Sequence, residues 1–109
     1  MKNEDLLFVW VAIKEVLAPA CRGLVQVRDE PGDWAIDTPS GRPFIKLRIQ
    51  KKHVGLYVLP LYYHPEALDQ ALRLHLNGKV TLRFSKPDAL PVEALQRQAE
   101  TCLALVGLY

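Results

Sequence analysis

The feature that most constrains the fold is a regular alternation of apolar and polar residues at positions 43–59, interrupted by a polar stretch at 50–53. Successive side chains of a β-strand point to opposite faces of a sheet, so a period of two predicts strands with one buried face. The interruption is short enough for a tight turn, and the segment therefore predicts an antiparallel hairpin. The residues expected to be buried are Ile45, Leu47, Leu56 and Val58.

Further period-two segments lie on both sides of this hairpin. Pro31-Gly32 and Pro39-Ser40-Gly41 mark turns before it, where glycine and proline favour the backbone angles that turns need. The first four strands are joined by connections short enough for an antiparallel meander. The predicted strands cover residues 24–29, 33–38, 43–50, 53–59 and 80–84.

Helical spacing of apolar residues predicts three helices around these strands. Asn3 can cap the first, Pro65 suits the first position of the second, and the third follows Pro91. The order α-β-β-β-β-α-β-α defines an α+β fold with two layers, in which helices cover one face of a five-stranded antiparallel sheet. With 109 residues, half of them hydrophobic, the chain fits one domain over 1–109.

The alternation also assigns strand residues to the two faces of the sheet. The face expected to be buried holds Val25, Val27, Ile36, Ile45, Leu47, Ile49, Val54, Leu56, Val58, Val80, Leu82 and Phe84. The open face, expected to meet solvent, holds Gln26, Arg28, Phe44, Lys46, Arg48, Tyr57, Thr81 and Arg83.

Four cations on the open face surround two aromatic rings, Tyr57 and Phe44, which would serve a ligand as a stacking platform. Lys46, Arg48 and Arg83 should converge beside Tyr57, with no carboxylate from the central strands to oppose them. An anionic small molecule or an acidic protein partner would gain charge-assisted hydrogen bonds there. A solvated face that binds nothing explains the same residues. Nucleic acid is disfavoured, because the basic stripe is short and the net charge is only +2.

A second polar and aromatic cluster follows the third strand. It suits either a pocket that transfers protons or a charged turn followed by tyrosines at a rim. No motif places a nucleophile beside a base, no glycine-rich phosphate loop occurs, and no histidines have the spacing of metal ligands. No catalytic residue, cofactor or metal site is therefore predicted, and an enzyme is the least favoured class. The cluster consists of Lys51, Lys52, His53, Tyr57, Tyr62, Tyr63 and His64.

The apolar residues of the first helix bear on where the protein is located in the cell and on whether it forms a dimer. Its apolar run at 6–13 is too short to cross a membrane and follows two acidic residues, so no export signal or membrane segment is predicted and a cytoplasmic location is expected. Cys21 and Cys102 are expected to be reduced and buried. Phe8 and Val11 remain on the outer side of the helix and predict a symmetric homodimer, unless residues 105–109 cover them.

Two stretches, KKHVGLYVLPLYYHPEAL at 51–68 and NGKVTLRF at 77–84, resemble the YdhG-like family of small bacterial proteins of unknown function. The resemblance implies an α+β fold with helices on one side of an antiparallel sheet. Some relatives are described as frataxin-like iron chaperones, so iron binding is the alternative function. Frataxins use an acidic ridge, and this chain departs from it. The acidic residues of the first helix are only Glu4, Asp5 and Glu15. The positions that carry the YdhG-like pattern are Lys51 or Lys52, Val54, Tyr57, Pro60, Gly78, Lys79 and Phe84.

Overall fold

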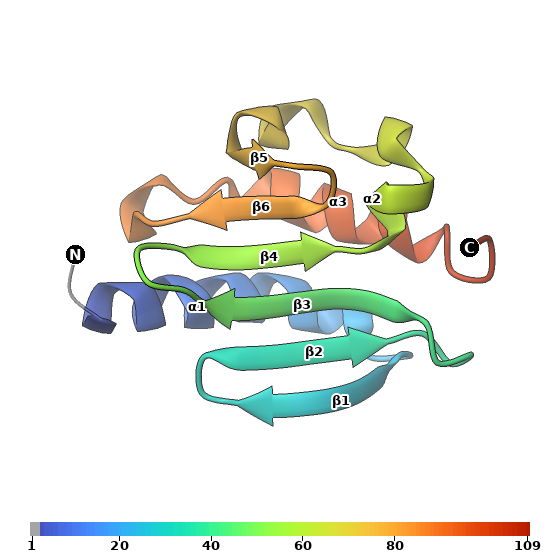
Figure 1. Cartoon of the computed structure of the whole chain (residues 1–109), viewed down its shortest axis with the longest axis horizontal. Coiled ribbons are helices and arrows are strands. Elements are labelled where there is room, and N and C mark those ends of the chain that lie inside the picture. The colour runs from blue at the N-terminus through green and yellow to red at the C-terminus, as the bar shows by residue number, and fades with distance from the viewer. Residues whose placement is uncertain (1–2) are drawn as a thin grey trace.

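The predicted hairpin forms the middle of an antiparallel sheet (Figure 1). In this computed structural model, which describes residues 3–109, strand β3 (Pro43–Ile49) pairs with β4 (Val54–Val58). Ile45 lies opposite Val58, and Leu47 lies opposite Leu56. Each of these four side chains is at most 5% exposed, which confirms the predicted register.

Within residues 3–109 the sheet has six strands where five were predicted. β1 (Val25–Glu30) and β2 (Asp33–Asp37) lie on one side of the hairpin, and β6 (Thr81–Phe84) and β5 (Leu76–Asn77) lie on the other. The order across the sheet is β1-β2-β3-β4-β6-β5, with every neighbouring pair antiparallel. The first four strands form the expected meander.

Helices α1 (Asn3–Leu17) and α3 (Val92–Leu103) lie on one side of the sheet, behind it in Figure 1, and pack against each other. The buried indole of Trp10 donates a hydrogen bond from Nε1 to the carbonyl oxygen of Leu47 at 2.8 Å, which ties α1 to β3. Short 3₁₀ turns η1 (Ala18–Cys21) and η4 (Pro87–Ala89) adjoin the two helices. The apolar core lies between the helices and the sheet.

The prediction of a helix that begins at Pro65 is wrong. The chain forms a short helix α2 (Pro60–Tyr63) and two 3₁₀ turns, η2 (Pro65–Ala67) and η3 (Gln70–His75), before β5. Leu68 and Asp69 between the turns are extended, because Gln98 of α3 accepts from the Asp69 amide and donates to the Ala67 carbonyl. A distant side chain therefore overrides the helical spacing of the leucines.

Two β-bulges correct the assignment of faces. Phe44 has no partner between the pairs Ile36–Ile45 and Asp37–Pro43, and its side chain turns into the core with no exposed surface. A second bulge at Val27 leaves that side chain 54% exposed on the edge strand.

The bulge at Val27 also changes the face of the sheet on which the neighbouring side chains lie. Val25 is exposed, whereas the side chain of Gln26 accepts a hydrogen bond from the buried indole of Trp34 at 2.9 Å. Val25 and Val27 therefore do not belong to the buried face, and Phe44 and Gln26 do not belong to the open face.

The outer side of α1 remains uncovered in the single chain. Phe8 is 67% exposed, and Val11 is also exposed. The C-terminal segment packs elsewhere, since the Tyr109 hydroxyl donates to the Pro43 carbonyl at 2.9 Å and its ring stacks on Tyr63. This segment does not cover the apolar residues, so the homodimer stays a prediction.

Both cysteines, Cys21 and Cys102, are buried free thiols, as expected from the sequence. Burial raises the pKa of each thiol to about 11, so both stay protonated near neutral pH. Within residues 3–109, every helix is too short or too polar to cross a membrane.

Candidate functional site

The four predicted site residues share the open face of the sheet, because cross-strand partners point to the same side. Two neighbouring rows carry them. The arginine row consists of Asp33, Arg48, Gly55 and Arg83, taken from β2 to β6. The tyrosine row consists of Ala35, Lys46, Tyr57 and Thr81 in the same order.

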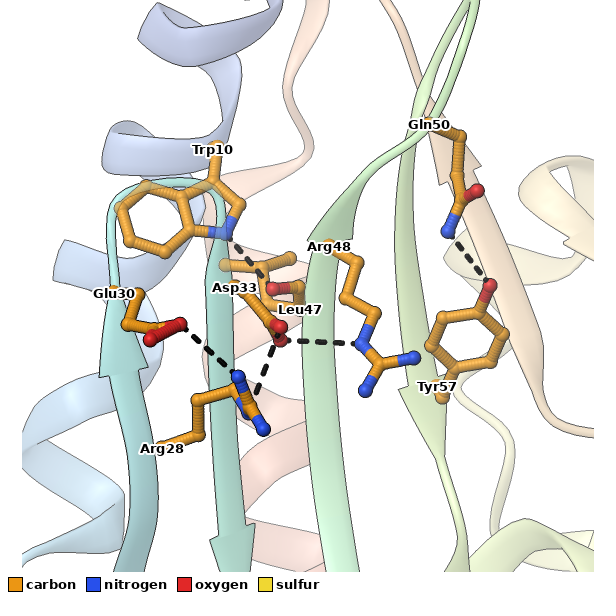
Figure 2. Close-up of polar contacts among 8 residues, drawn as sticks. All are labelled: Trp10, Arg28, Glu30, Asp33, Leu47, Arg48, Gln50 and Tyr57. Carbon is orange, nitrogen blue, oxygen red and sulfur yellow. Dashed lines mark hydrogen bonds and ion pairs between the residues drawn. The ribbon is translucent and has the colours of Figure 1, made fainter.

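Gly55 creates a gap in the arginine row, and the ring of Tyr57 lies over it. A Cβ atom at position 55 would be 3.3 Å from Cε2 of the ring and 3.4 Å from its hydroxyl oxygen. Gln50 donates from Nε2 to that hydroxyl at 3.1 Å, which helps to hold the ring along its strand (Figure 2). The ring therefore lies in the arginine row, between the positions of Arg48 and Arg83.

One side of the open face is neutralised by carboxylates that come from β1 and β2, outside the central strands. Arg48 donates from Nε to Oδ1 of Asp33 at 3.1 Å, and Arg28 lies 3.6 Å from Oδ2 of the same carboxylate. Arg28 also donates to Glu30 at 3.0 Å. Figure 2 shows these contacts in line across β1, β2 and β3. Asp33 is the first residue of the predicted strand 33–38, but only the pairing of β2 with β3 shows that it lies beside Arg48.

The other side of the open face keeps an excess of positive charge. No described residue forms an ion pair with Lys46 or Arg83. One terminal nitrogen of Arg48 points toward Tyr57 in Figure 2. The pKa of His53 is lowered, first by partial burial and then by the positive charge of Arg83. The region around Tyr57 is therefore a cationic surface with an aromatic ring at its centre.

The second cluster predicted from the sequence does not assemble. Lys51, Lys52 and His53 lie in the turn before β4, whereas Tyr62 and Tyr63 follow its other end. Strand β4 separates the two groups by five residues, or about 17 Å at the usual rise.

At the far end of β4 the tyrosines form a rim that the sequence did not reveal. Arg42 donates to the Tyr63 hydroxyl at 2.9 Å, and the rings of Tyr63 and Tyr109 stack with their centroids 5.5 Å apart. His64 lies in the same region, where its Nε2 is 3.4 Å from the Leu108 carbonyl oxygen. These contacts attach the C-terminal segment to the sheet end. They fit the rim interpretation better than a proton-transfer pocket.

The acidic residues that frataxin-like iron binding would need are dispersed. Among the residues with described side chains, no three His, Cys, Asp or Glu groups are close enough to hold a metal ion. Asp5 and Glu15 are ten positions apart on α1, about 15 Å along the helix axis. The side chain of Glu4 lies outside the described part of the chain.

A cavity of about 120 Å³ opens at the end of β6. His75, Arg83, Ser85 and Lys86 contribute its polar lining. Only Arg83 was singled out in the sequence, because the other three gather through the packing of η3 and η4 around the strand end.

Comparison of the chain with protein families, curated proteins and solved structures finds no match. The resemblance of residues 51–68 and 77–84 to the YdhG-like family therefore stays a hypothesis.

Proposed function

We propose that this protein is a binding module whose open sheet face holds an acidic segment of a partner protein. The observation that carries the proposal is the ring of Tyr57, which packs over Gly55 between Arg48 and Arg83. Lys46 lies beside Tyr57 in the tyrosine row and adds a third cation.

The spacing of the cations favours an extended ligand. Arg48 and Arg83 lie on the two strands that flank β4, so their backbones are about 10 Å apart at the usual strand separation. Carboxylates two residues apart on an extended peptide point to the same side and lie about 7 Å apart, and the length of the glutamate and arginine side chains covers the difference. One acidic segment lying across the strands can therefore reach both guanidinium groups.

The ring over Gly55 favours a peptide over a small metabolite. Sites for small molecules are usually concave and enclose most of the ligand. Here an aromatic ring fills the only gap in the arginine row, and it offers an apolar surface for the stem of a glutamate side chain. Each charge-assisted contact is only partly shielded from water, so binding is expected to be weak and sensitive to salt.

A fluorescent oligoglutamate peptide tests the proposal by anisotropy at low and moderate salt. The Lys46→Glu, Arg83→Glu double variant should bind about tenfold more weakly or worse, because each reversal replaces an attraction of up to about 1 kcal/mol with a repulsion. The matched control is Arg22→Glu, Arg73→Glu, which changes the net charge equally at two exposed positions outside the sheet. Equal loss in the two variants, or no binding by the wild type at low salt, would refute the proposal.

A further inference from the structure

The cavity at the end of β6 lies next to the proposed binding face. Arg83 belongs to both, because it stands in the arginine row and also lines the cavity. Phe84 and Leu90 form an apolar wall. A hole large enough for one water molecule needs about 10–15 Å³, so about 120 Å³ accommodates a tetrahedral oxyanion.

The charges around this cavity have one sign. Arg83 and Lys86 line it, and neither forms an ion pair with any residue that the structure describes. No carboxylate is among the lining residues, although Asp88 is exposed nearby on η4. The hydroxyl of Ser85 adds a neutral donor.

His75 is held in a fixed orientation at the edge of the cavity. Its ring packs on Phe84 with the centroids 4.6 Å apart, and its Nδ1 lies 3.2 Å from the carbonyl oxygen of Arg83. A carbonyl oxygen only accepts hydrogen bonds, so Nδ1 carries a proton and donates.

We propose that this cavity binds a phosphoryl group carried by the acidic ligand of the open face. This inference rests on the proposed function and names a chemical group that the ligand bears. A single arginine satisfies a planar carboxylate through two parallel hydrogen bonds. A phosphoryl group has three terminal oxygens and a charge near −2, so it needs further donors and cations. Arg83, Lys86 and Ser85 all line the cavity, and their side chains are donors of the kind that a phosphoryl group accepts from.

The test compares two acidic peptides that differ only in whether one serine is phosphorylated. The wild type should bind the phosphorylated peptide about tenfold more tightly. Lys86→Gln should abolish this preference and leave the affinity for the unphosphorylated peptide unchanged. Lys46→Gln, which lies outside the cavity, should weaken both peptides alike. The control Lys52→Gln removes one positive charge in the turn before β4 and should preserve the preference.

Several results would overturn the inference without touching the proposed function. Equal binding of both peptides by the wild type would do so, as would a preference that survives Lys86→Gln. Conversely, inorganic phosphate that shifts the amide resonance of Ser85 in the wild type but not in Lys86→Gln would support the cavity even if oligoglutamate fails to bind. Phosphate as effective as the phosphopeptide would identify the free anion as the ligand.

Discussion

Replacing Gln98 by leucine is expected to lower the free energy of unfolding by about 2–3 kcal/mol. The side chain is only 2% exposed, and it supplies partners to two backbone groups. Oε1 accepts from the Asp69 amide at 2.7 Å, and Nε2 donates to the Ala67 carbonyl at 2.9 Å. Leucine has a similar volume, so the loss comes from the orphaned backbone groups at about 1–3 kcal/mol each. The two groups together would cost about 2–6 kcal/mol, and access of water to these half-buried residues places the loss in the lower part of that range.

Denaturation by urea measures this change, and Gln96→Leu on the exposed side of the same helix is the matched control. The control should stay within about 0.5 kcal/mol of the wild type. Hydrogen exchange at the Asp69 amide should accelerate in Gln98→Leu. A stability loss equal to that of the control would refute the claim that Gln98 holds residues 67–69 in place. Because this segment leads to His75, the variant should also bind phosphate more weakly.

Other consequences follow from the core, the first helix and the open face. Leu56→Ala should cost about 2–5 kcal/mol in urea denaturation, as a cavity in the central strand would, and a change below about 0.5 kcal/mol would place Leu56 outside the core. Sedimentation at micromolar concentration should show a dimer that Phe8→Glu, Val11→Glu converts to a monomer, and a monomeric wild type would contradict the assignment of α1 to an interface. Arg83→Gln should raise the pKa of His53, measured by NMR, because removing a nearby positive charge favours the imidazolium, and an unchanged value would leave burial as the sole cause. Since the pKa of His53 is lowered in the folded state, this residue should reduce stability as the pH falls below about 6.5.

The hairpin could be predicted because each apolar position in it meets another across the strands. Leu47 and Leu56 are partners, and a slip of one residue would expose both. The bulges at Phe44 and Val27 could not be predicted, since an extra residue in one strand is defined only by its pairing with the next strand. The mistaken helix after Pro65 has the same origin, because Gln98 acts on it from about thirty residues away.

As with the fold, the sequence predicted part of the candidate site. Alternation alone placed Lys46, Arg48, Tyr57 and Arg83 on one face, since that property depends only on the period of a strand. The ion pair between Arg48 and Asp33 depends on the register of β2 against β3. The cavity at the end of β6 depends on tertiary packing, which no local pattern encodes.

A titration of the isotopically labelled protein with oligoglutamate, followed by the NMR shifts of backbone amides, tests the central claim most directly. The account predicts that the largest shifts occur on the open face, at Lys46, Gly55, Tyr57 and Arg83, and that they diminish as salt is added. Shifts of equal size at Arg22 and Arg73, or shifts confined to α1, would contradict it.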